Sequence, residues 1–214
     1  MWFQVIITEP VTMVTDYVLG IMGLYFAISL HRLNRERAQN SVRLWMWSFA
    51  FLSAAAFFGG TSHGFGESLS ALSKALIWKC TVMSVGMAGL LMPLGTITST
   101  LSNPARRWTS AAFILKFFAY AAWMMRHDKF LFVVCDYAPS MLAVMILQIY
   151  AARKYGAESA RWLIGGVLVT FGAAAVQAAQ IRLHEHFNHN DLYHVIQMSA
   201  LYLFYRGSRL LRDI

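Results

Sequence analysis

Seven apolar stretches, each close to the length of a membrane-spanning helix, constrain the fold more than any other feature of this sequence. A helix needs about 20 mostly apolar residues to cross the hydrocarbon core of a bilayer. Only 13% of the 214 residues are charged, about half the share of a typical soluble domain. We therefore expect an all-α integral membrane protein, a seven-transmembrane-helix bundle that forms a single domain over residues 1–214. The expected spans are Val11–Leu30, Leu44–Phe65, Ala71–Leu94, Trp108–Met125, Phe130–Ala151, Trp162–Leu183 and Leu192–Leu211.

The basic residues predict the orientation of this bundle. Cytoplasmic loops of membrane proteins carry an excess of Lys and Arg. Twelve of the 18 basic residues fall in the loops after the first, third and fifth spans or in the C-terminal tail. We therefore expect the N-terminus outside and the C-terminus in the cytoplasm, as in a bacterial inner (plasma) membrane protein. Because the basic residues are scattered singly between apolar segments, we expect membrane lipid as the partner and no nucleic acid.

Histidines and acidic residues gather at the opposite end of the expected bundle. Six of the seven histidines and seven of the ten acids fall at the outer ends of spans or in outer loops. The positive-inside rule says little about these residue types, so it does not explain the asymmetry. The densest stretch, HEHFNHNDLYH at residues 184–194, lies between the last two spans. We therefore expect a polar site in the outer half, above an apolar inner half.

The first two spans each supply a candidate for this site. Asp16 lies one to two turns inside the first span, on the same helical face as Thr12 and two glycines. An ionisable side chain at that depth is costly, which makes it a functional candidate; alternatively, it neutralises Lys79 or caps a neighbouring helix. The second span ends in FFGGTSHGFGE, where glycines leave space around Ser62 and His63. An interfacial histidine without a partner is the alternative for His63.

The third and fifth spans carry further charged groups. Lys79, about two turns inside the third span, is expected to reach outward or to pair with Asp16 or Asp136. A retinal Schiff base is excluded, because the seventh span has no lysine in the position used by rhodopsin-like proteins. Asp136 lies near the outer end of the fifth span, just before Pro139, and is a candidate acid or base.

Polar residues in the sixth span follow helical spacing. Gln177, Gln180 and His184 form a stripe that begins at Thr170 and runs up to the histidine-rich stretch. Glutamines within a span often serve only as hydrogen-bonding contacts between helices. The alignment of this stripe with His184, expected at the frayed end of the span, favours a cavity lining.

The seventh span has one polar face over its first two turns. Asn190, His194 and Gln197 lie at positions i, i+4 and i+7, and Asp191 is one turn from His194. We expect Asn190 and Asp191 to act as the N-terminal cap of this helix, with His186 and His189 in the loop before it. Asn190, Asp191 and Gln197 are therefore further candidates for the cavity lining, together with Lys79.

These histidines supply enough ligands for a metal site. A catalytic zinc site usually has three protein ligands and one open position. His63, His194 and one of His184, His189 or Asp16 would complete such a set. The alternative is a hydrated, titratable loop without metal, since histidine-rich tracts only suggest metal binding.

His63 and the sequence NDLYHVIQ, which contains His194, resemble motifs of a superfamily of membrane hydrolases. Its members are alkaline ceramidases, progestin-and-adipoQ receptors and post-GPI-attachment lipid-remodelling proteins. They share a seven-helix core with Ser-x3-His in the second helix, an Asp in the third and His-x3-His at the start of the seventh. This chain has Gly59 four residues before His63 and Asn190 four residues before His194, and its third span has no acid.

The resemblance implies a zinc-dependent hydrolase of a lipid amide or ester. Zinc held by His63, His194 and a third ligand would activate a water molecule. In this hypothesis Asp16 or Asp136 acts as the general acid or base, and Ser62 or a nearby backbone amide stabilises the oxyanion. The departures from the family motifs favour an alternative, a seven-helix binding or sensor protein that uses the same cavity without catalysis. A transporter is less favoured because the sequence has no visible inverted repeat.

Overall fold

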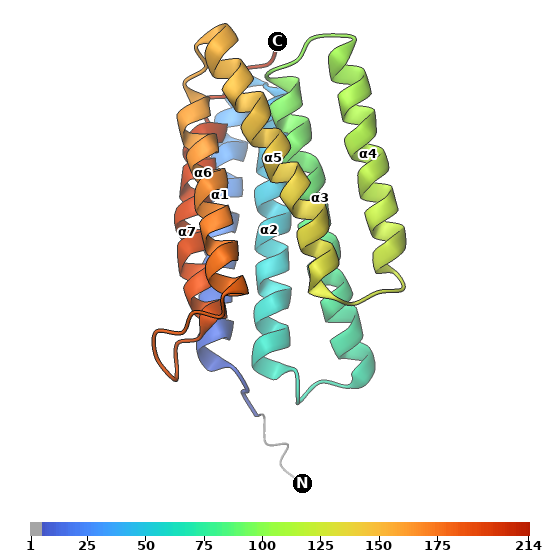
Figure 1. Ribbon diagram of the computed structural model, residues 1–214, viewed down its shortest axis with the longest axis vertical. Coiled ribbons are helices and arrows are strands. Elements are labelled where there is room, and N and C mark those ends of the chain that lie inside the picture. The colour runs from blue at the N-terminus through green and yellow to red at the C-terminus, as the bar shows by residue number, and fades with distance from the viewer. Residues whose placement is uncertain (1–5) are drawn as a thin grey trace.

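The computed structural model describes residues 6–214 as a bundle of long helices (Figure 1). Five of these helices are long and apolar enough to cross a membrane, namely α1, α2, α3, α5 and α6. The all-α prediction is confirmed, and these five helices indicate an integral membrane protein. The helices are α1 (Pro10–Arg37), α2 (Asn40–Phe65), α3 (Ala71–Thr98), α4 (Ala105–Met124), α5 (Phe130–Tyr155), α6 (Ser159–Ala178) and α7 (His189–Ser208).

Six helices form a ring, and α4 lies outside it. The order around the ring is α1, α2, α3, α5, α6 and α7, and α7 packs back against α1. Figure 1 shows α4 at the edge of the bundle, where it packs mainly against α3. The expectation that sequential helices pack as neighbours is confirmed, although α4 contacts α5 much less than it contacts α3. The ring passes directly from α3 to α5, so the cavity-forming helices exclude α4.

Specific contacts hold α4 against the ring. The Tyr120 hydroxyl of α4 donates to the carbonyl of Val82 in α3 at 2.8 Å. Its ring lies over Gly86, where an added Cβ would stand 2.3 Å from a ring carbon. Lys116 of α4 forms an ion pair with Asp136 of α5, with Nζ and Oδ1 2.5 Å apart. These contacts explain why a helix outside the ring has a defined position.

The chain between α6 and α7 differs from our expectation. The sixth helix ends at Ala178, five residues before the predicted end at Leu183. Gln180 then adopts a positive φ of 52°, which a continuing right-handed helix does not allow. His184 lies in the following loop, paired with Phe187 in an isolated β-bridge, and not at a frayed helix end. The seventh helix begins at His189, three residues before the predicted start at Leu192, so His189 lies in the helix and not in the loop.

Asn188, and not Asn190 or Asp191, caps the start of α7. Its side chain accepts hydrogen bonds from the backbone amides of Asn190 (2.7 Å) and Asp191 (3.4 Å). In return, the Asp191 carboxylate accepts from the backbone amide of Asn188 at 2.7 Å. This reciprocal arrangement is a capping box, which satisfies amides that the first helical turn leaves free.

Apolar side chains, many of them aromatic, fill the half of the ring that holds the start of α2 and the end of α7, which we call the inner half; the half with the start of α1 is the outer half. An apolar inner half agrees with the expectation from the sequence. The Phe26 ring stacks on Tyr205 with the centroids 4.3 Å apart, and it meets the edge of Phe49 at 5.8 Å. Trp45 packs against Phe204, with centroids 5.6 Å apart. These side chains belong to or pack against the main apolar core of the bundle.

The C-terminal tail closes the inner end of the bundle. The carboxylate of Asp213 accepts hydrogen bonds from the backbone amides of Asn40 (2.7 Å) and Ser41 (2.9 Å), the first two residues of α2. Just before it, Leu211 is only 2% exposed and belongs to the main apolar core. The tail therefore caps α2 with a side chain that lies 172 residues from Ser41 in sequence.

Candidate functional site

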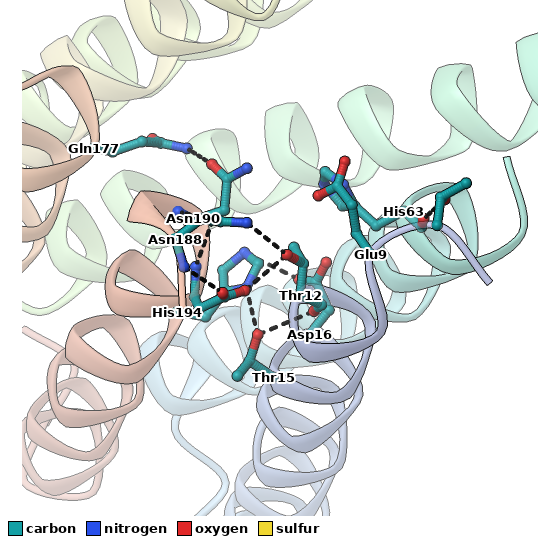
Figure 2. Close-up of polar contacts among 11 residues, drawn as sticks. Glu9, Thr12, Thr15, Asp16, His63, Gln177, Asn188, Asn190 and His194 are labelled. Atoms are coloured by element: carbon teal, nitrogen blue, oxygen red, sulfur yellow. Dashed lines mark hydrogen bonds and ion pairs between the residues drawn. The ribbon is translucent and has the colours of Figure 1, made fainter. Parts of the chain in front are cut away.

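Asp16 of α1 and His194 of α7 form a buried pair in the outer half of the ring (Figure 2). Asp16 Oδ1 and His194 Nε2 are 3.3 Å apart, and the two residues are 5% and 8% exposed. The other ring nitrogen, Nδ1, lies 3.0 Å from the hydroxyl oxygen of Thr15. Both nitrogens of this imidazole are therefore engaged by α1.

The hydrogen bonds around this pair limit the number of protons that it holds. The Thr15 hydroxyl donates to the carbonyl of Thr12 at 3.0 Å, so its oxygen is free to accept from Nδ1–H of His194. In that arrangement Nε2 and the Asp16 carboxyl share one further proton. The pair is then either an imidazolium with a carboxylate or a neutral imidazole with a carboxylic acid. Either form is neutral overall, which suits a site inside a membrane bundle.

A second set of polar contacts joins the same two helices. The Thr12 hydroxyl donates to Asp191 Oδ1 at 2.7 Å, and Asp191 is fully buried. Asn188 Nδ2 also reaches the Thr12 hydroxyl at 3.4 Å. Because its carboxylate serves Thr12 and the capping box, Asp191 does not line the cavity as predicted. It positions the start of α7, and with it His194.

A cavity of about 450 Å³ lies beside the Asp16–His194 pair. All six ring helices contribute to its wall. Of the residues predicted from the sequence, Asp16, His63, Gln177, Asn190, Gln197 and His194 line it. Thr170, where the predicted stripe of the sixth span begins, also lines it, whereas sequence reasoning assigned no role in this site to three further polar lining residues: Thr81, Tyr137 and Tyr193.

Polar residues of α6 and α7 bond to one another along the cavity wall. Gln177 Nε2 donates to Asn190 Oδ1 at 3.1 Å (Figure 2). One to two turns deeper, the Thr170 hydroxyl donates to Gln197 Oε1 at 3.2 Å. Gln197 Nε2 in turn donates to the Tyr193 hydroxyl at 3.0 Å. The polar stripes expected on these two helices therefore act both as contacts between helices and as cavity lining.

The rest of the cavity wall is apolar. Leu19, Leu52, Leu201 and Phe204 line it toward the inner half, where Phe204 joins the aromatic core. Phe130, Val133, Val134 and Ala138 of α5 and Phe171 and Ala174 of α6 line its side. Polar groups are thus concentrated near the outer end, and one cavity presents two chemically distinct regions.

His63 reaches the cavity from the end of α2. Its Nδ1 lies 3.1 Å from Glu9 Oε2, and its side chain is 34% exposed (Figure 2). The alternative, an interfacial histidine without a partner, therefore does not hold. Ser62 is not among the residues that line the cavity. Gly59 does line it, and a Cβ there would lie 3.3 Å from Asp16 Oδ2, so the glycine makes room for the carboxylate.

The predicted zinc ligands do not form one cluster. His184 and His189 lie outside the cavity wall, and His184 Nδ1 accepts from the backbone amide of His186 at 3.2 Å. Across residues 6–214, no three His, Cys, Asp or Glu side chains are placed to hold a metal ion together. His194 also has both nitrogens engaged by Asp16 and Thr15. The side chains present therefore do not fit the expected zinc site.

Three predicted site residues lie elsewhere in the fold. Lys79 pairs with Asp128 at 2.6 Å and donates to the carbonyls of Met124 and His127, and not to Asp16 or Asp136. Asp136 pairs with Lys116 on the side of α5 that faces α3 and α4. Gln180 is exposed beyond the end of α6. Lys79 has the structural pairing role expected of it, but with a different partner.

The site can hold a polar group and exchange a proton with it. An imidazole and a carboxyl that share a proton can donate and accept at one position. The amides of Gln177, Asn190 and Gln197 add donors and acceptors along the same wall. Thr15, which sequence reasoning missed, was detectable as a hydroxyl residue directly beside the buried Asp16.

Comparisons with known proteins give one match that covers nearly the whole chain. Neither a curated protein nor a solved structure matches this chain. A protein family described only as a family of unknown function (DUF6962) matches residues 11–213. That range includes all seven helices except the first residue of α1, and it includes every residue of the cavity wall. The chain therefore belongs to the DUF6962 family.

Proposed function

We propose that this protein binds a membrane amphiphile in the outer cavity, with the polar head at the Asp16–His194 pair. The observation that carries the proposal is the division of the cavity into a polar outer region and an apolar inner region. Its volume of about 450 Å³ lies within the usual range for small-molecule sites, about 300–1,000 Å³. An apolar chain directed toward Leu201 and Phe204 would bury its surface away from polar groups.

The ligand would enter sideways from the bilayer. Phe130 and Val134 of α5 line the cavity and are also 39% and 42% exposed on the surface of the bundle. On the other side of this opening, Phe171 and Ala174 of α6 line the cavity and are partly exposed. A lipid could therefore pass between α5 and α6 without its chain crossing water.

The charge of the lining favours a neutral or amine-bearing head group. The cavity wall includes Asp16 and the two histidines His63 and His194, but no lysine or arginine among the residues that the structure describes. A phosphate buried there would lack the charged partner that buried anions require. Hydroxyl, amide and amine groups can donate hydrogen bonds to the carboxyl and amide oxygens of the cavity wall.

The test is to fill the opening and analyse the lipid that remains bound. Ala174→Trp places a large side chain in the cavity, whereas the matched control Ala175→Trp adds it at an exposed neighbouring position outside the wall. Lipids extracted from each purified protein are identified by mass spectrometry. We expect one neutral or amine-bearing amphiphile to be enriched in the wild type and the control and depleted in Ala174→Trp. Equal lipid content in the wild type, Ala174→Trp and Ala175→Trp would contradict the proposal.

A hydrolase of a lipid amide or ester is the second candidate. It is favoured by the position of His63, His194 and Asp16 around one cavity. His63 and His194 also carry the resemblance to the superfamily of alkaline ceramidases, and membership of that superfamily is part of this proposal. Asp16, which shares a proton with His194, is the candidate general acid or base. Turnover of a panel of lipid amides and esters by the wild type, but not by His194→Ala, would support this candidate, whereas binding without turnover supports the first.

The seven-span topology is also part of the proposal. We infer that α4 and α7 cross the membrane with the five more apolar helices, because Figure 1 shows them running parallel or antiparallel to those helices over a similar length. The ends of α1, α3, α5 and α7 that carry most Lys and Arg would face the cytoplasm. The protein would then sit in a bacterial plasma membrane with the cavity on the outer side.

A further inference from the structure

A second hollow lies on the outside of the ring, in the groove between α1 and α7. It has a volume of about 380 Å³ and is lined by Met22 of α1 and by Met198, Ser199, Tyr202 and Leu203 of α7. The α7 residues lie at positions i, i+1, i+4 and i+5, so they share one helical face. The groove therefore runs along the helix axis, on a surface that would face the lipid chains.

The same face of α7 continues to Arg206, one turn beyond Tyr202. Arg206 Nη1 donates to the Tyr202 hydroxyl at 3.0 Å. The centre of its guanidinium lies 4.5 Å from the ring centroid of Trp162 in α6. Two aromatic side chains thus fix the position of this cation at the inner end of the groove.

The charge of Arg206 has no counter-ion among residues 6–214. Over the part of the chain that the structure covers, no carboxylate lies within ion-pair distance of any arginine. Further guanidiniums stand nearby: Arg161 lies 5.3 Å from the Trp162 ring, and Arg209 lies 5.4 Å from the Tyr205 ring. This end of α6 and α7 is therefore a cationic cluster held on aromatic side chains.

We propose that the α1–α7 groove and Arg206 together bind an anionic phospholipid, with an acyl chain along the groove and the phosphate at the guanidinium. The charge of the cluster is complementary to a phosphate, and the planar guanidinium can donate two parallel hydrogen bonds to it. The apolar groove that leads to Arg206 favours a lipid over a free anion. Aromatic residues such as Tyr202 and Trp162 are also typical of the head-group level of a bilayer.

This site is separate from the outer cavity and selects a different lipid. The cavity wall has acidic and neutral groups, whereas the groove ends at uncompensated cations. The two sites also lie toward opposite ends of α7, since His194 is in its second turn and Arg206 in its last. The proposal therefore does not depend on the proposed function of the cavity.

The experiment measures lipid binding to the purified full chain in detergent by native mass spectrometry. The probes are a short-chain phosphatidylglycerol and a phosphatidylcholine with the same acyl chains. Arg206→Gln removes the charge, and Ser199→Phe fills the groove. The matched control is Arg107→Gln, which removes an exposed arginine at the same end of the bundle, away from the groove (Figure 1).

We expect the wild type and Arg107→Gln to prefer phosphatidylglycerol. One arginine near an anionic lipid contributes about 1 kcal/mol, so Arg206→Gln should bind phosphatidylglycerol about five-fold more weakly. Phosphatidylcholine, whose choline cation offsets the charge of its phosphate, should lose less. Ser199→Phe should weaken the binding of both lipids. Circular dichroism of each variant checks that the helices are retained.

Three results would overturn the proposal. The first is equal binding of the two lipids by the wild type. The second is an equal loss in Arg107→Gln and Arg206→Gln, which would indicate general attraction to positive charge. The third is displacement of phosphatidylglycerol by inorganic phosphate combined with normal binding in Ser199→Phe, which would indicate an anion site without a role for the groove.

Discussion

Asp16 and His194 lie 3.3 Å apart although they belong to the first and last helices of the chain. Their contact, with the Thr12–Asp191 hydrogen bond one turn away, closes the outer end of the ring between α1 and α7. Because His194 is also held by Thr15, both ends of this imidazole depend on α1. The pair is therefore both a structural contact between helices and part of the cavity wall.

Removing the carboxyl of Asp16 should destabilise the protein. Asp16→Ala leaves the buried His194 Nε2 without its partner, which costs about 1–3 kcal/mol. For a chain of this size that corresponds to a decrease in Tm of about 2–4 °C for each kcal/mol. Thermal unfolding in detergent, followed by circular dichroism, measures the effect. Asp16→Asn keeps a hydrogen-bonding group and should have a smaller effect.

The chain offers a matched control for this substitution. Glu185 and His186 also form a carboxylate–imidazole pair at 3.3 Å, but their side chains are 77% and 80% exposed. Exposed ion pairs contribute about 0–1 kcal/mol, so Glu185→Ala should leave the Tm almost unchanged. Equal shifts for Asp16→Ala and Glu185→Ala would show that burial of the Asp16 pair has no energetic consequence.

The ion pair between Lys116 and Asp136 should control the attachment of α4. Lys116→Met leaves Asp136, whose side chain is 6% exposed, without its cation, at a cost of about 3–5 kcal/mol. Replacing both residues, as in Lys116→Met with Asp136→Leu, should restore most of the stability, because no charge is left buried. A double-mutant cycle on Tm measures the coupling.

The neighbouring pair Lys79–Asp128 provides the comparison for that cycle. Asp128 is 70% exposed, so Asp128→Asn should cost no more than about 1 kcal/mol. If the double variant Lys116→Met with Asp136→Leu were as unstable as Lys116→Met alone, the loss would come from packing of the lysine stem and not from an unpaired carboxylate.

A zinc measurement decides between the observed geometry, which predicts no metal site, and the family resemblance, which implies one. Because no three ligands converge in residues 6–214, we expect purified protein to hold no stoichiometric zinc, before or after incubation with the metal. Elemental mass spectrometry of the wild type, His63→Ala and His194→Ala makes the measurement. One zinc per chain in the wild type, lost in both variants, would contradict this expectation and favour the hydrolase.

Labelling of single cysteines tests the proposed topology. Cys80 and Cys135 are free thiols, so both are first replaced by alanine. Glu67→Cys then lies between α2 and α3, and Arg107→Cys lies at the opposite end of the bundle (Figure 1). In intact bacteria, a membrane-impermeant maleimide should label Glu67→Cys and spare Arg107→Cys. The reverse pattern would invert the topology.

Local patterns predicted the helices well but not their partners. The apolar stretches and Asp16 on the Thr12 face of the first helix are properties of sequence spacing, and they were identified correctly. The end of α6 was missed because Ile181 and Leu183 continue the apolar pattern, whereas the backbone turns at Gln180. Lys79 was assigned the wrong partner because its long stem can reach several acids, and only tertiary packing selects Asp128.

The composition of the site depends on where the helices begin and end, which sequence spacing does not fix. Asp191 was expected in the cavity, but α7 begins at His189, and the capping box turns this carboxylate toward Asn188 and Thr12. His184 was expected near the metal, but it lies in the loop beyond α6. Both errors arise from a shift of a few residues in a helix end, since such a shift changes which side chains share a face.

The two contacts that close the bundle also set the order in which it can be completed during synthesis. Thr12 and Asp191 are 179 residues apart, and Ser41 and Asp213 are 172 apart. The start of α1 and the start of α2 therefore cannot form these contacts until almost all of the chain has left the ribosome. The cavity has no early, partly assembled form, and premature termination anywhere before α7 leaves the buried carboxyl of Asp16 without its imidazole.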